Sequence, residues 1–126
     1  MRYLLLIFIF LFFCNTLWSQ ETPAFYGFVL DKTKSKIGRD FYETFTSLWE
    51  FPQGTEYMNI VIDEHSDPRW GSQILIFVED NLVYYTLLKP RAEDISEKAE
   101  EAIQAVFNYL MDYLKSQKYL EQEKFI

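Results

Sequence analysis

The densest group of side chains that could do chemistry in this 126-residue chain is the run DEHSD at positions 63–67. A carboxylate beside a histidine can orient or activate it, so Asp63, His65 and Asp67 could form a metal site or an acid/base site. The chain has only one histidine, however, so no second imidazole completes a metal site or a catalytic triad. Because the run ends at Pro68, we predict a hydrophilic connection between two strands instead.

Other sequence signatures of enzymes are missing. The sequence contains no GxSxG, P-loop or GxGxxG pattern, and its single cysteine, Cys14, excludes an intrachain disulfide framework and a multi-cysteine zinc site. Glu43 and Glu50 stand seven residues apart, a spacing typical of the polar face of a helix. We therefore predict no enzyme, with no catalytic, cofactor-binding or metal-binding residues. A hydrolase that uses His65 is the alternative from this class.

The charge balance excludes a second class of function. The chain has 12 basic and 19 acidic residues, a formal net charge of −7, which repels phosphate backbones and anionic membrane surfaces. We therefore expect no nucleic-acid partner. With 49% hydrophobic and 25% charged residues, the composition is that of a globular chain whose length suits one hydrophobic core.

Residues 1–19 have the composition of a secretory signal peptide. Arg2 precedes an unbroken apolar run at positions 4–13, which matches the hydrophobic region of a signal and is too short to cross a bilayer. We expect cleavage after Ser19 and export of the remaining chain. Cys14 follows two phenylalanines rather than the small residue that lipidation requires, so we expect it to leave with the signal.

Two helices are predicted in the remaining domain, residues 20–126. The first spans 35–49 and ends before a Pro-Gly turn, and the second is a long amphipathic helix from 94 to about 120 that begins with the capping box Asp94-Ile95-Ser96-Glu97. The apolar residues recur at spacings of three and four. They are Ile37, Phe41, Phe45 and Leu48 in the first helix, and Ile95, Ala99, Ile103, Val106, Leu110 and Leu114 in the second.

Three strands are predicted between the helices, at 57–63, 72–79 and 82–88, with Asp80-Asn81 as a two-residue hairpin turn. An apolar patch at 25–30 suggests a fourth, a short edge strand or a packed arm. The fold class is therefore α+β, an antiparallel sheet of three or four strands packed with an N-terminal helix and a long C-terminal helix. The strand at 72–79 is apolar on both faces, which two helices do not cover fully and which suggests contact with another chain.

Aromatic residues make up 19% of the chain and are the candidates for contacts with other proteins. Tryptophan and tyrosine bury large areas at low entropic cost and are enriched in binding hot spots. Trp70 stands out because it follows a polar turn at the start of a strand, where we expect its ring at the rim of the sheet. Core packing is the alternative for the others.

Two segments together resemble the curli assembly and transport component CsgE family, over about 30–104. They are Ile37-Gly38, Asp40-Phe41-Tyr42, Phe45 and Trp49-Glu50 on the first helix, then Arg69-Trp70-Gly71-Ser72 opening a strand that leads through a tight hairpin to Pro90. The second helix departs from the family pattern, because Glu97, Glu100 and Glu101 give it a more acidic face.

The resemblance implies a noncatalytic periplasmic accessory factor of curli secretion. Such a protein forms a ring-shaped homo-oligomer that caps the outer-membrane pore CsgG, and selects and chaperones the curli amyloid subunits. For self-association or pore docking we predict Arg69, Trp70 and Gly71, and less directly Phe41, Tyr42 and Trp49, for which core packing is the alternative. A standalone periplasmic ligand-binding or inhibitor module is the alternative function.

Overall fold

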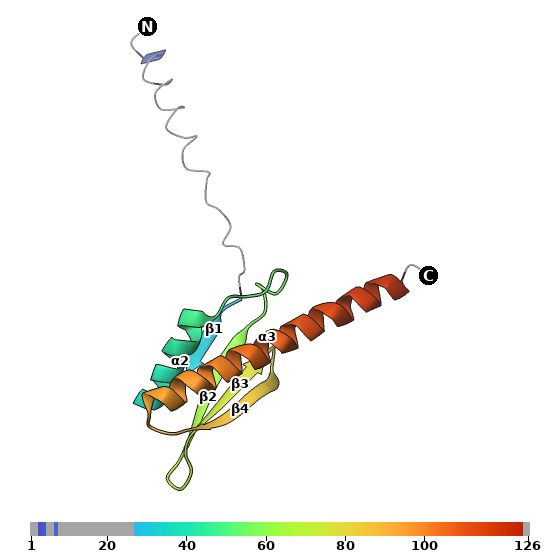
Figure 1. Ribbon diagram of the computed structural model, residues 1–126. Coiled ribbons are helices and arrows are strands. Elements are labelled where there is room, and N and C mark those ends of the chain that lie inside the picture. Colours follow the sequence, from blue (N-terminus) through green and yellow to red (C-terminus); the bar gives the residue numbers. More distant parts are fainter. Residues whose placement is uncertain (1–2, 5–6, 8–26, 125–126) are drawn as a thin grey trace.

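The computed structural model describes residues 3–4, 7 and 27–124, in which a four-stranded sheet packs against two helices (Figure 1). Its elements follow the order β1 (Val29–Lys32), α2 (Lys36–Leu48), β2 (Ile60–Asp67), β3 (Gly71–Val78), β4 (Asn81–Leu88) and α3 (Ala92–Glu123). The predicted signal peptide, 1–19, lies outside the described residues except at positions 3, 4 and 7, and Cys14 lies outside them altogether.

The sheet has the order β1-β2-β3-β4, and β2, β3 and β4 form the predicted antiparallel meander. β1 is the fourth strand and runs parallel to β2, with Val29 opposite Ile60. It is parallel because α2 carries the chain back along the sheet before β2 begins. The α+β class and the short edge strand are therefore confirmed, and the sheet is mixed rather than purely antiparallel.

Both helices pack on one face of the sheet, where α2 and α3 also contact each other. Figure 1 shows α3 running across this side of the strands. The core between the layers consists of fully buried side chains from the strands and helices: Ile60, Ile62, Ile74, Ile76 and Val78 from the sheet, Phe41 and Phe45 from α2, and Ala99, Ala102, Val106 and Leu110 from α3. We call this covered side the inner face.

The opposite side of the sheet, the outer face, is covered by no helix within residues 27–124. Strand pairing aligns its apolar side chains, which lie on all four strands: Leu30, Val61, Leu75, Phe77, Leu82, Tyr85 and Leu87. Several of them are exposed to solvent. The outer face of the doubly apolar strand β3 is thus left uncovered by the two helices, as expected. Exposed apolar side chains also lie on the two edge strands, β1 and β4.

The predicted helix at 35–49 is confirmed as α2, with one error in its apolar face. Ser35 caps it by accepting a hydrogen bond from the Gly38 amide at 3.0 Å. Leu48, however, is 54% exposed, and Trp49 instead stacks on Phe45 with ring centroids 5.5 Å apart. The buried stripe therefore keeps a spacing of four to the end of the helix.

The predicted hairpin turn is wrong by one residue. Glu79 and Asp80 adopt positive φ angles of 47° and 70°, so they are the two central residues, and Asn81 already belongs to β4. Two successive left-handed residues give the type I′ geometry that matches strand twist. β4 then carries an irregularity opposite Ile76 and Phe77, which shifts its register.

The predicted capping box of the second helix is also wrong. α3 begins two residues earlier, at Ala92, after Arg91, whose side chain makes no capping bond. Asp94 lies within the first turn and accepts a hydrogen bond from the Lys89 amide at 2.8 Å. It therefore fastens the end of β4 to α3.

Residues 115–124 are exposed throughout, and the end of α3 extends beyond the sheet (Figure 1). In the described residues no helix is both long and apolar enough to cross a membrane.

Candidate protein-interaction site

We predicted that the polar run 63–67 connects two strands. It is instead the last part of β2. It pairs with the start of β3, with His65 opposite Gln73 and Asp67 opposite Gly71. Alternation along the strand places Glu64 on the inner face and His65 on the outer face. The prediction is wrong because the polar side chains of this run lie on a strand and continue its pairing with β3.

Glu64 is fully buried and holds the start of α2. Its carboxylate accepts hydrogen bonds from the amides of Lys34 and Ser35, both at 2.7 Å, and from the Ser35 hydroxyl at 2.5 Å. That hydroxyl in turn accepts from the Gly38 amide, so the carboxylate and the helix cap form one network. A negative charge at a helix N-terminus is also favoured by the helix dipole.

The network keeps Glu64 ionised. Burial by itself raises the pKa of this carboxyl, but hydrogen bonds from Ser35, Lys34 and Ser72 outweigh it and lower the pKa below its ordinary value. Position 38 is glycine because a Cβ there would collide with the Glu64 carboxylate. Glu64 thus positions the start of α2.

His65 lies away from this network and forms no catalytic constellation with it. Its Nε2 is 3.7 Å from Asp63 Oδ2, and its side chain is largely exposed on the outer face. Among the residues that the structure describes, no group of three His, Cys, Asp or Glu side chains is placed to hold a metal ion. Within the described residues His65 is therefore an exposed side chain beside Asp63 and not part of a metal-binding cluster.

The tip of the β2–β3 hairpin carries the predicted interaction residues Arg69, Trp70 and Gly71. The Arg69 amide donates to Asp67 Oδ1 at 2.7 Å, which closes an Asx turn, and Gly71 has a φ of 80° that glycine adopts without strain. These constraints present Trp70 with 65% of its surface exposed, as the sequence suggested. In Figure 1 this hairpin extends beyond both helices.

The other three predicted residues belong to α2 and its end. Phe41 is fully buried and packs in the core, so core packing, the alternative, describes its place. Tyr42 is half-buried and donates its hydroxyl to the Val29 carbonyl at 3.0 Å. Trp49 is half-buried between Phe45 and Phe51, and its Nε1 is buried without a hydrogen-bond partner in the described part of the chain.

The six predicted residues do not form one patch. Ser72, next to the hairpin tip, lies 3.4 Å from Ser35 at the beginning of α2, whereas Trp49 follows the end of that helix. The candidate surface is therefore the hairpin tip together with the outer face. Tyr85 on β4 was among the aromatic candidates and is exposed, whereas its exposed neighbours Leu82 and Leu87 were missed, because their common face became apparent only from the strand register.

A groove of about 670 Å³ lies where α2 meets the start of α3. Side chains of both charge signs line it, among them Lys36, Asp40, Glu43 and Arg91. It is open to solvent, whereas a ligand-binding module needs a largely enclosed, mostly apolar pocket with few polar groups. The groove therefore gives little support to that alternative.

Comparison with known proteins adds an independent finding. The sequence model described as curli assembly protein CsgE matches residues 25–125. The chain is 36% identical over 89 residues to the curli production assembly/transport component CsgE of Escherichia coli O157:H7, and to that of an E. coli O6:H1 strain, covering 70% of this chain. It is 38% identical over 72 residues to the protein of that name from Salmonella typhi, covering 56% of this chain. The matches span 65% of the length of the E. coli proteins and 52% of the Salmonella protein.

Proposed function

This chain belongs to the CsgE family of curli assembly proteins, and from that premise we propose that it is a noncatalytic accessory factor of curli secretion. In this proposal residues 1–19 direct export to the periplasm and are removed, and residues 20–126 act as a single domain. The domain forms a ring-shaped homo-oligomer that caps a CsgG-like outer-membrane pore, and it selects and chaperones curli amyloid subunits.

The observation that carries the proposal is the exposed Trp70 on a constrained hairpin tip. Burial of the Trp70 indole against another protein would contribute about 25 cal/mol per Å² of apolar surface removed from water. Constraint of the tip reduces the entropy lost on binding. Arg69, Trp70 and Gly71 therefore form the contact for self-association or pore docking.

Secretion of this kind needs no catalytic site on the accessory factor. A disordered client held under a cap loses conformational entropy, and it regains that entropy by leaving through the pore. The acidic domain, with a formal net charge of −7 over the full chain, also discourages nonspecific adhesion to other acidic proteins.

Deletion of the gene tests the proposal directly, with surface amyloid and export of curli-type subunits as the measurements. We expect both to be lost in the deletion strain and restored by the unaltered gene. We also expect a His65→Ala gene to restore them, because His65 is largely exposed on the outer face and lies away from the network around Glu64. Normal export in the deletion strain would refute the proposed role, and failure of His65→Ala with normal protein levels would revive the hydrolase.

Trp70→Ala tests the contact itself by light scattering. We expect a folded protein of smaller mass, because the ring contributes to association rather than to the core. Tyr119→Ala is the matched control, since Tyr119 is 69% exposed near the end of α3. An unchanged oligomer in Trp70→Ala would remove this residue from the interface, and a monomeric unaltered protein would favour the ligand-binding or inhibitor module.

A further inference from the structure

The two edges of the sheet are protected very differently. β1, at one edge, has four residues, of which Asp31 and Lys32 are charged. β4, at the other edge, has eight residues, NLVYYTLL, with no charge and no proline. Folded proteins commonly protect edge strands by shortness, charge or proline, because an exposed edge pairs with other chains. β1 has the first two of these protections, and β4 has only the irregularity opposite Ile76 and Phe77.

The edge of β4 is open within the described part of the chain. β4 is the terminal strand of the sheet and pairs there only with β3. The Leu87 carbonyl accepts a long hydrogen bond from the Thr86 hydroxyl at 3.5 Å. The other backbone groups on this edge are available to a further strand, which is the mode of recognition called strand addition. The side chains that β4 turns to the outer face, Leu82, Tyr85 and Leu87, are exposed and apolar.

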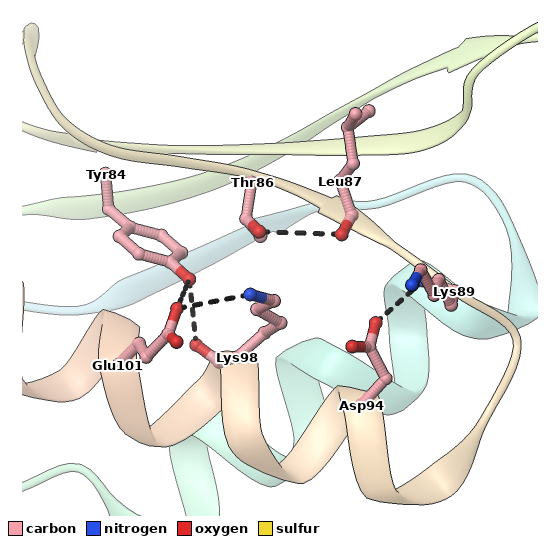
Figure 2. Close-up of polar contacts among 7 residues, drawn as sticks. All are labelled: Tyr84, Thr86, Leu87, Lys89, Asp94, Lys98 and Glu101. Carbon is pink, nitrogen blue, oxygen red and sulfur yellow. Dashed lines mark hydrogen bonds and ion pairs between the residues drawn. The ribbon is translucent and has the colours of Figure 1, made fainter.

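The inner side of this edge is flanked by carboxylates of α3. Figure 2 shows Tyr84 reaching from β4 to α3, where its single hydroxyl proton is shared between Glu101 Oε2 at 3.0 Å and the Lys98 carbonyl at 3.2 Å. Glu97 is exposed one turn before Glu101 and therefore lies on the same flank of the helix. The single cation of this group, Lys98, already contacts Glu101 at 3.5 Å.

The apolar outer face and the carboxylates of α3 on the inner side determine which side chains suit a strand added to β4. Successive side chains of a strand point to opposite faces, so every second one would meet the apolar outer face and the others would approach Glu97 and Glu101. Apolar side chains suit the first set of positions. Lysine or arginine suits the second, because each brings a positive charge and N–H donors to the carboxylates.

We propose that the edge of β4 binds, by strand addition, an extended peptide segment in which apolar residues alternate with lysine or arginine. The inference rests on the proposed function, because such a segment would belong to the secreted client. It specifies where the client docks and the chemical pattern that it presents.

A second copy of this chain does not fit the edge as well. Its own β4 carries no basic residue that could meet the carboxylates of α3. Its β1 offers one lysine, Lys32, but is only four residues long and places Asp31 beside it. Charge complementarity therefore favours a basic client segment over self-pairing at this edge.

The first experiment titrates the full chain with a synthetic ten-residue peptide that alternates valine and lysine, and measures binding by calorimetry. Two further peptides carry N-methyl groups on every second backbone amide, one in each register. Only every second amide of an added strand faces β4. We therefore expect the peptide methylated on the other set of amides to bind and the peptide methylated on the facing set to fail. Equal binding of the two would overturn the proposal, because adhesion to an acidic or apolar surface does not depend on the register.

Two matched variants locate the site on the sheet. Leu87 on β4 and Leu30 on β1 are 40% and 39% exposed on the same face, at opposite edges. We expect Leu87→Lys to weaken peptide binding about tenfold, because it puts a charge where the peptide's valines would meet the apolar outer face, and Leu30→Lys to change it less than about twofold. Equal effects of the two substitutions would overturn the proposal.

Hydrogen exchange of the amides of residues 81–88 supplies the last measurement. We expect the peptide to protect outward-facing amides of β4 and none in β1. Concentration-dependent protection of β4 without peptide would assign the edge to a second copy and overturn the proposal. A strain that loses export on gene deletion while the protein fails to bind the peptide would refute this inference and leave the proposed function standing.

Discussion

The two faces of β3 consist of similar residues but serve different purposes. On the inner face Ile74, Ile76 and Val78 are fully buried under the helices, whereas Leu75 and Phe77 on the outer face stay partly exposed. Apolar composition alone therefore does not make a core. The inner face stabilises the fold because helices cover it, and the outer face remains available for contact with other molecules.

The largest expected difference between the faces comes from shortening neighbouring side chains of β3. We expect Ile74→Ala to lower the free energy of unfolding by about 3 kcal/mol, because it leaves a cavity in the core. Leu75→Ala should lower it by less than about 1 kcal/mol, because solvent already reaches that site. Urea unfolding of both variants measures the difference, and equal losses would show that the outer face is covered in solution.

Removal of the buried charge is expected to have the next largest effect. Glu64→Gln replaces one acceptor oxygen by a donor that faces other donors, so we expect a loss of about 2 kcal/mol in the free energy of unfolding. Asp63→Asn is the control on the outer face and should change it by less than about 0.5 kcal/mol. Comparable losses in the two variants would contradict the role assigned to the network around Glu64.

The same carboxylate predicts how stability depends on pH. Because hydrogen bonds lower the pKa of Glu64 in the folded state, its contribution is fully present above the pKa of an unfolded glutamate, about 4.3. It is lost as the pH falls through the lower folded value. We therefore expect the stability difference between the unaltered protein and Glu64→Gln to shrink below about pH 4. A difference that stays constant from pH 7 to pH 3 would contradict this.

The smallest effect is expected from two adjacent tyrosines of β4. Tyr84 turns to the helices, where burial, together with the nearby Glu101, raises its pKa to about 12. Loss of its hydroxyl in Tyr84→Phe should cost about 1 kcal/mol, whereas Tyr85→Phe on the outer face should cost almost nothing. Thermal unfolding of the pair provides the measurement. A larger loss for Tyr85→Phe would indicate that its hydroxyl has a partner in solution.

The elements were predictable from the sequence wherever an apolar period was long. The spacing of four in α2, the alternation in β3 and the long stripe of α3 each indicated the observed structure, and the exposed Trp70 followed from its place after a polar turn. These features depend on local periodicity, which is directly visible in a sequence.

The predictions that failed concern residues whose hydrogen-bond or pairing partners are not apparent from the local sequence. Glu64 appeared to belong to a solvated turn because its hydrogen-bond donors lie at Lys34 and Ser35, 30 and 29 positions away. Asp94 appeared to be a helix cap, but it bonds to Lys89 at the end of β4. The common face of the β4 side chains likewise required the register across three strands.

The parallel pairing of β1 with β2 also has a consequence for the order of folding. Val29 pairs with Ile60, 31 positions later, whereas the β3–β4 hairpin closes between Val78 and Asn81. The entropy lost in closing a loop rises with its length, so the meander can form first and β1 joins it late. We therefore expect β1 to be the strand that detaches most readily during brief openings of the native protein, so that the protected edge of the sheet is kinetically the weaker one.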